Sequence, residues 1–160
     1  MKAPTRPLLA LTARDLMSTD VISVPREMSL QAAARLLGRA AISGAPVVDA
    51  DGRCIGVLSA TDFLAWAEQG QEAHSILHPG CMISAWEVPS ADTLPVEEVE
   101  RYMTADPVMV TPGTPIGTLA KMMLDAHIHR VIVVDTENRP VGVVSSLDIL
   151  GAVARAAHAA

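Results

Sequence analysis

The chain has 160 residues, half of them hydrophobic, yet it holds only two Trp, one Tyr and one Phe, and its formal net charge is −6. This length suits one compact domain or two small halves with a shared aliphatic core, and so much apolar surface suggests self-association. The acidic balance excludes a general nucleic-acid or anionic-membrane binder, and no apolar run reaches the roughly 18 residues of a membrane span.

The first half predicts a strand, a helix, two more strands and a second helix. After a lead over 1–12 and a short helical lead-in over 13–18, the segment Asp20–Val24 is expected to be a strand. Ser29 stands where a helix N-cap belongs, ahead of apolar residues at helical spacing. The later elements are strands at 45–48 and 54–58, joined by a turn at 49–52, and a helix from about Thr61 to Glu68.

The second half repeats this order after a connector over 70–98 that Gly and Pro residues interrupt. In the connector, Trp86 is expected to pack onto the body of the protein. Thr114 is predicted as an N-cap, with Pro115 at the first helical position. The other elements are strands at 108–110, 130–134 and 141–144, a turn at 135–139 and a last helix from about Leu147 into an Ala-rich tail.

The two halves are copies of one unit. The stretch Gly56–Asp62 (GVLSATD) recurs as Gly142–Asp148 (GVVSSLD), and 142 minus 56 gives an offset of 86 residues. This offset holds without a gap through two whole cycles of elements, which indicates an internal duplication. Among the identical pairs are Met17 with Met103, Asp20 with Asp106, Val24 with Val110, Ala34 with Ala120, Ile42 with Ile128 and Arg53 with Arg139.

The predicted fold is therefore α+β, built from two α/β-type repeats. In each repeat the two later strands pair antiparallel across a tight turn, and the earlier helix is a crossover. One repeat has too little core to stand alone, so we expect two repeats packed sheet to sheet with pseudo-two-fold symmetry. The predicted organisation is a lead over 1–12, repeats over 13–69 and 99–154, a linker over 70–98 and a tail over 155–160.

Residues from about 13 to 153 resemble a tandem pair of cystathionine-beta-synthase (CBS) domains, called a Bateman module. The likeness rests on GVLSATD and GVVSSLD, on the APVVD and HRVIVVD strands, and on the Met-Ser and Met-Thr lead-ins. It implies a regulatory sensor that binds an adenine nucleotide, such as AMP, ADP or ATP, in the cleft between the repeats. It also implies a disc-like homodimer, and we expect a stand-alone pair that passes its state to an effector protein.

The resemblance implies that the Ser and Asp of the repeated motif hold the ribose. Ser59 with Asp62, and Ser145 with Asp148, carry this pattern. An ionised carboxylate accepts two hydrogen bonds, which suits the two adjacent hydroxyls of a ribose. Ser-x-x-Asp before an apolar helix also fits a capping-box-like arrangement, and the local sequence leaves both interpretations open. Thr61 adds a hydroxyl to the first copy only.

His129 and Arg130 open the second strand of the second repeat, where the resemblance implies a basic residue on phosphate. Arg130 is the better candidate, because neighbouring strand residues point to opposite faces and a planar guanidinium suits phosphate oxygens. The alternative is a surface Arg paired with an acid, and the counterpart in the first repeat is Gly44. The resemblance implies an adenine slot in each half, and the aliphatic members of both slots could equally be core residues. One slot comprises Thr19, Asp20, Val21 and Ile22 with Ala45 and Pro46, and the other comprises Ala105, Pro107 and Val108 with Val131.

Other chemistry has little support in the sequence. His127-x-His129 lacks a Cys or carboxylate pattern, so no metal site is predicted. Cys54 and Cys81 have neither metal-site nor disulfide spacing, which favours thiols in the cytoplasm. The sequence shows neither a nucleophile–base pair nor a phosphate-binding GxxxxGK[ST] loop, so it does not predict an enzyme. The alternatives to a nucleotide sensor are a structural dimerisation module whose motifs only cap helices, and a sensor of S-adenosylmethionine or NAD.

Overall fold

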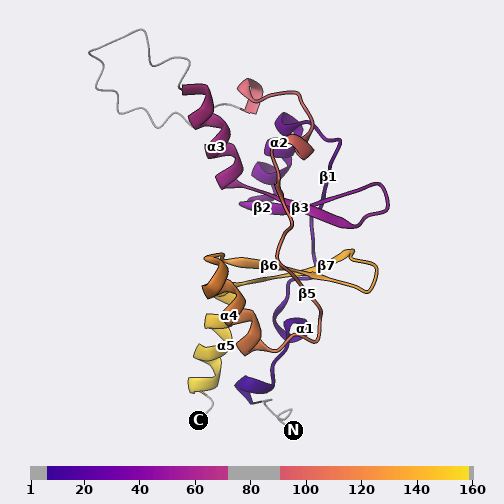
Figure 1. The fold of residues 1–160 in the computed structure, drawn as a ribbon. Helices are drawn as coiled ribbons and strands as arrows, with labels where there is room; N and C mark the ends of the chain where they lie inside the picture. Colours follow the sequence, from indigo (N-terminus) through magenta and orange to yellow (C-terminus); the bar gives the residue numbers. More distant parts are fainter. Residues whose placement is uncertain (1–6, 72–90, 159–160) are drawn as a thin grey trace, which may run out of the picture. The chain divides into compact units, whose positions relative to one another are not determined.

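The computed structural model describes residues 7–71 and 91–158 (Figure 1). The predictions for Cys81 and Trp86 and for the start of the N-terminal lead fall outside these residues. The described chain divides into two compact units, one formed by 7–22, 50–54 and 106–158 and the other by 23–49, 55–71 and 91–105. None of the helices in residues 7–71 and 91–158 has the length and apolar character of a membrane-spanning segment.

The second of these units contains a four-stranded sheet in the order β1-β2-β3-β4, with β1 parallel to β2 and β4 antiparallel to β3. Helix α2 is the crossover between β1 and β2, as predicted. The elements are β1 (Val24–Pro25), α2 (Leu30–Ala40), β2 (Gly44–Val48), β3 (Cys54–Ser59), α3 (Ala60–Gln71), the 3₁₀ turns η2 (Ala91–Thr93) and η3 (Val99–Arg101), and β4 (Thr104–Ala105).

The first unit contains a three-stranded sheet in the order β5-β6-β7. Strands β5 and β6 are parallel, and β6 and β7 are antiparallel, as the tight turn between them predicted. Helix α4 packs against α5 (Figure 1). The elements are η1 (Leu8–Ala10), α1 (Ala13–Leu16), β5 (Met109–Val110), α4 (Ile116–Ala126), β6 (Arg130–Val134), β7 (Pro140–Ser145) and α5 (Ser146–His158). The α+β class with two repeats of small mixed sheets and helices is thus confirmed, while the packing of sheet on sheet stays a prediction.

Helix starts follow the sequence with one exception. The Ser29 hydroxyl oxygen accepts a hydrogen bond from the Ala32 N–H at 3.1 Å and so caps α2 as predicted. The predicted Thr114 cap is wrong by one residue, because the N-cap of α4 is Pro115. The Thr114 hydroxyl oxygen instead accepts from the Thr111 N–H at 3.2 Å, within the preceding turn.

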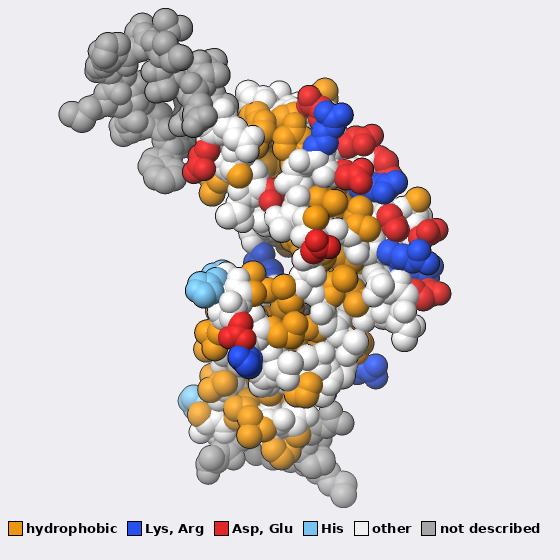
Figure 2. Space-filling model, in the orientation of Figure 1, with side chains coloured by type: hydrophobic (Ala, Val, Ile, Leu, Met, Phe, Trp, Pro, Cys, Tyr) orange, Lys and Arg blue, Asp and Glu red, His pale blue; other side chains and the backbone are white. Residues whose placement is uncertain are grey.

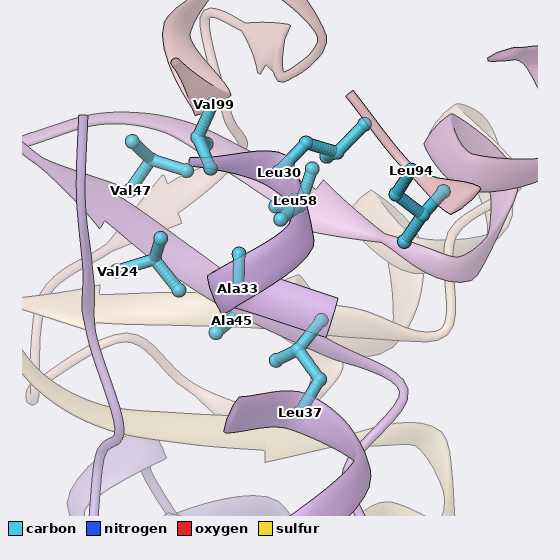
Figure 3. Packing of buried hydrophobic residues seen from close by; sticks show 9 residues of the cluster. All are labelled: Val24, Leu30, Ala33, Leu37, Ala45, Val47, Leu58, Leu94 and Val99. Carbon is cyan, nitrogen blue, oxygen red and sulfur yellow. The ribbon is translucent and has the colours of Figure 1, made fainter. Parts of the chain in front are cut away.

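Each unit has an aliphatic core, as the scarcity of aromatic residues predicts. In one unit, α2 packs its apolar stripe onto the sheet (Figure 3). Burying one such Val or Leu side chain stabilises a fold by about 1.5–3 kcal/mol. The labelled cluster is Val24, Leu30, Ala33, Leu37, Ala45, Val47, Leu58, Leu94 and Val99. The other unit buries Ala13, Val110, Leu119, Met123, Val131, Val133 and Val144.

The segment at the start of each repeat packs in the unit of the other repeat. Thr12 and Ser18 form antiparallel bridges with Pro115 and Val143 of the second repeat. At the same offset of 86 residues, Glu98 bridges Ser29 and Thr104 pairs with Val57 in the first repeat. We call 11–18 and 97–104 the exchanged leads. The duplication therefore extends to the backbone hydrogen bonds, and each unit is completed by a lead from the other repeat.

The surface of the α4 and α5 region is rich in hydrophobic side chains (Figure 2). Leu124 and Leu147 are 75% and 74% exposed, and Leu150 and Val153 are also exposed. Acidic and basic side chains gather instead on the unit that contains α2 (Figure 2), where Arg26 pairs with Glu27 and Glu100. The apolar face agrees with the expected self-association, which stays a prediction.

Candidate functional site

The Ser and Asp of the first motif are bonded to one another at the junction of β3 and α3. The Ser59 N–H donates to Asp62 Oδ2 at 2.7 Å, and the Ser59 hydroxyl donates to the same oxygen at 3.2 Å. The other oxygen, Asp62 Oδ1, accepts from the Thr104 hydroxyl at 2.9 Å. The Thr61 hydroxyl is 2.8 Å from the Ser59 hydroxyl. Protein groups therefore engage both carboxylate oxygens of Asp62.

The second motif, where β7 meets α5, is a reciprocal capping box. The Ser145 N–H and hydroxyl donate to Asp148 Oδ2 at 2.7 and 2.8 Å, and the Asp148 N–H donates back to Ser145 Oγ at 3.2 Å. Asp148 is half-buried. In the described part of the chain, its second oxygen, Oδ1, accepts no hydrogen bond. Capping thus uses one oxygen of Asp148, and the other has no hydrogen bond from the described residues.

A third copy of this geometry shows what capping alone requires. At the start of α1, the Thr12 N–H and hydroxyl donate to Asp15 Oδ2 at 2.9 and 3.0 Å. Thr12 and Asp15 are not among the ligand-binding candidates. Bonds to a single carboxylate oxygen are therefore a capping feature, and any evidence for ligand binding must come from the second oxygen and its surroundings.

Strand register places Arg130 beside the second motif. Arg130 is the antiparallel partner of Ser145, and such partners point to the same face of a sheet. The His129 carbonyl accepts from the Ser146 N–H at 2.9 Å, just as the Ser43 carbonyl accepts from the Ala60 N–H in the first repeat. These contacts fix the end of β7 against the start of β6. A guanidinium group and the Ser-x-x-Asp carboxylate therefore share one face.

The first repeat has Gly44 at the equivalent position, where an added side chain would be crowded. A Cβ atom on Gly44 would lie 3.0 Å from the Leu58 carbonyl oxygen and 3.2 Å from the Ser59 Cβ. Both distances are tighter than ordinary van der Waals contact. Gly44 therefore allows a close approach of β2 to the Ser59 junction, and the two motifs have different surroundings.

The predicted grouping of the adenine candidates is wrong, because Thr19–Ile22 and their expected partners Ala45 and Pro46 belong to different units. Thr19–Ile22 belong to the unit that contains Ser145 and Asp148 of the second repeat, although they lie near the start of the first repeat in the chain. Pro107 and Val108 lie in that unit and are half-buried, whereas the exposed Ala105 lies with Ser59 and Asp62. Ala45, Pro46 and Val131 are buried, and Ala45 and Val131 belong to the two cores.

Sequence reasoning missed Thr104 as a neighbour of the first motif. The Met-Ser and Met-Thr lead-ins place Ser18 and Thr104 at equivalent positions, so a signal was present. The sequence did not indicate that the leads are exchanged, and this exchange brings Thr104 to Asp62.

Among the described residues, no group of three or more His, Cys, Asp or Glu side chains could hold a metal ion. His127 instead ends α4 with a left-handed backbone, at φ 54°.

The CBS domain family matches residues 13–68 and 96–155, and the chain belongs to this family. It is thus a CBS domain pair, a regulatory module. It is 28% identical over 151 residues to MJ1426 of Methanocaldococcus jannaschii, covering 87% of this chain and 89% of that protein. It is 26% identical over 135 residues to a homoserine O-acetyltransferase of Methanococcoides burtonii, covering 84% of this chain but only 22% of that enzyme.

Solved structures of CBS pairs share the fold. The CBS domain pair of MJ0100, in complex with 5′-methylthioadenosine and S-adenosyl-L-methionine, superposes with a TM-score of 0.71 at 23% identity, covering 91% of this chain and 98% of that one. CBSX2 in complex with AMP superposes with a TM-score of 0.69, also at 23% identity, covering 90% of this chain and 96% of that one. At this identity the likeness establishes the fold alone.

Proposed function

We propose that this CBS pair is a sensor of an adenine nucleotide such as AMP or ATP, with the ribose on Asp148 and the phosphate on Arg130. One observation carries the proposal: Arg130 stands opposite Ser145 in register, on the same face as a carboxylate with an oxygen that accepts no hydrogen bond from the described residues. The place between the two repeats, which the family resemblance implies, stays a prediction.

The chemistry of each group suits one part of a nucleotide. Adjacent ribose hydroxyls are donors, and Asp148 Oδ1 has lone pairs for them. The Arg130 guanidinium is permanently charged and matches phosphate oxygens with a planar fork. Thr19–Ile22 belong to the same unit and remain the candidates for contacting adenine. A ligand that binds one arrangement of the module more tightly shifts its population, and an effector protein would respond to that shift.

The complexes of the similar structures favour an adenosyl ligand without deciding its tail. Their ligands are AMP in one case, and 5′-methylthioadenosine with S-adenosyl-L-methionine in the other. All three share adenine and ribose. A sulfonium group is cationic and gains nothing from a neighbouring guanidinium, whereas a phosphate does. Arg130 therefore favours a phosphorylated ligand for this chain over S-adenosylmethionine.

The capping geometry favours a second candidate function, a structural dimerisation module without a ligand. The Asp15 and Asp148 carboxylates each accept a backbone N–H and a hydroxyl on a single oxygen. In this alternative, both repeated motifs serve only to begin helices. Replacing Asp62 or Asp148 would then lower stability equally with and without nucleotide.

A binding experiment separates the two candidates. Ligand-free protein would be titrated calorimetrically with AMP, ATP, NAD and S-adenosylmethionine, and melted at rising ligand concentrations. At 100 times Kd, a ligand stabilises the native state by about 2.7 kcal/mol. We expect the phosphorylated ligands to raise the melting temperature and Arg130→Ala and Asp148→Ala to abolish the rise. Asp15→Ala, which removes the matching cap, should melt earlier but bind with an unchanged Kd. No rise with any of the four would favour the structural module.

A further inference from the structure

The two motifs differ in how many acceptor positions their carboxylates retain. A carboxylate has about four lone-pair positions, two on each oxygen. Asp62 uses three of them, for the Ser59 N–H, the Ser59 hydroxyl and the Thr104 hydroxyl. Asp148 uses two, both on Oδ2. Two ribose hydroxyls need two acceptor positions, and in the described structure only the second carboxylate has both.

The difference originates in the exchanged leads. Thr104 of β4 pairs with Val57 and thereby reaches Asp62, and Ser18 pairs with Val143 at the equivalent place. Yet Asp148 receives no hydrogen bond from Ser18. A β-branched Thr has a restricted χ1 angle, whereas a Ser side chain turns more freely. Thr104 is therefore held against its carboxylate in a way that Ser18 is not.

We propose that Thr104 closes the first carboxylate to a ribose, so that the chain binds one adenosyl ligand, at Asp148. This inference rests on the proposed function and adds to it the choice of site. The surroundings agree, because the closed motif has Gly44 where the open motif has Arg130. Added atoms at Gly44 would meet the Ser59 junction. The first motif thus only caps its helix, because protein groups occupy three acceptor positions of Asp62. The second motif caps its helix and also binds the ribose.

Calorimetric titration with AMP tests the choice of site. We expect one AMP per chain, loss of binding in Asp148→Asn, and a Kd within about twofold of the parent in Asp62→Asn, since each substitution keeps an oxygen that can cap its helix. Thr104→Val removes the hydroxyl but keeps the shape of the side chain, and should add a second, weaker AMP. Ser18→Ala, the matched control, should leave one.

Each other outcome has a definite meaning. Two AMP molecules of equal affinity in the parent protein, or binding lost in Asp62→Asn but kept in Asp148→Asn, would overturn the inference and leave the proposed function standing. No binding of either AMP or ATP would overturn both. A ligand-free double-mutant cycle gives an independent check, because residues in direct contact are coupled. Thr104→Val with Asp62→Asn should shift the unfolding midpoint non-additively, and Ser18→Ala with Asp148→Asn additively. Additivity in the first pair would overturn the role of Thr104.

Discussion

At the residue scale, the first glycine of each repeated motif, Gly56 or Gly142, is tightly packed against a methionine of an exchanged lead. A Cβ atom on Gly142 would lie 2.5 Å from Met17 Sδ, and one on Gly56 would lie 2.5 Å from Met103 Sδ and 2.9 Å from the Thr104 carbonyl oxygen. The methionine of each exchanged lead therefore sits on a glycine of the other repeat, and only a residue without a side chain fits.

Replacing these glycines should destabilise the fold unequally. Overpacking costs about 1–3 kcal/mol, and we expect Gly56→Ala to cost more than Gly142→Ala, because a Met side chain can turn aside whereas the Thr104 carbonyl cannot. Denaturant unfolding would measure both. Gly38→Ala is the control: it has open space in α2 and should be neutral or stabilising by up to about 1 kcal/mol. Equal stability of Gly56→Ala and the parent protein would refute the contact.

The turn between β6 and β7 should make stability depend on pH through Asp135. Asp135 Oδ1 accepts from the Glu137 and Arg139 N–H groups at 2.8 and 3.0 Å. The Arg139 bond above all, then the Glu137 bond and the Arg139 charge, lowers the pKa of Asp135 below its ordinary value of 3.8. A lowered folded-state pKa stabilises the fold above the unfolded pKa, and this contribution is lost as pH falls through the folded pKa.

Asp135→Asn isolates this effect because an amide does not titrate. We expect the parent to be the more stable protein at pH values above about 4, and the difference in unfolding midpoint to shrink as pH falls below that value. Denaturant unfolding of both proteins across this range is the measurement. A difference that stays constant to the lowest pH would show that Asp135 has no lowered pKa in the folded chain.

At the element scale, the equivalent helices α2 and α4 begin differently. Ser29 caps α2 with its side chain, whereas Pro115, 86 residues later, has no side-chain acceptor. We therefore expect Ser29→Ala to cost about 1 kcal/mol in unfolding free energy and Ser29→Gly only a few tenths. Denaturant unfolding gives both values. Equal costs for the two would indicate that the Ser29 side chain stabilises the fold through another contact.

Elements were predictable where a local pattern decides them. The bounds of β6, Arg130–Val134, and the Ser29 cap follow from residue type and spacing. The strand expected over Asp20–Val24 is wrong in extent, because only Val24 and Pro25 pair with β2, at Val47 and Val48. The residues up to Ile22 belong to the other unit, and partners distant in sequence leave no trace in a local pattern.

At the scale of the whole molecule, the duplication explains what the sequence could not predict. Ser18 and Thr104 are equivalent residues on equivalent leads. The repeated sequence pattern is therefore the same whether each lead packs on its own repeat or on the other one. The candidate site inherits this ambiguity. Its Ser, Asp and Arg were identifiable from motif positions, but the grouping of Thr19–Ile22 with Asp148 and the contact of Thr104 with Asp62 depend on the exchange.

The exchange of leads predicts an effect that would not occur if each lead packed on its own repeat. Ala13 and Val99 are equivalent positions of the two leads, and both are fully buried. Ala13 packs in the core with Val131 and Val133, and Val99 in the core with Val47 and Leu58. A substitution in the lead of one repeat should therefore loosen the sheet of the other.

Hydrogen exchange can report each unit separately, because amides open with the local stability of their surroundings. Ala13→Leu overpacks one core by about 1–3 kcal/mol and should speed exchange in β6 more than in β2. Val99→Ala leaves a cavity and forfeits about 2 kcal/mol of burial, so exchange should quicken in β2 more than in β6. If the effects were reversed, each lead would pack on its own repeat in solution. If both variants loosened both sheets equally, the two units would unfold as one.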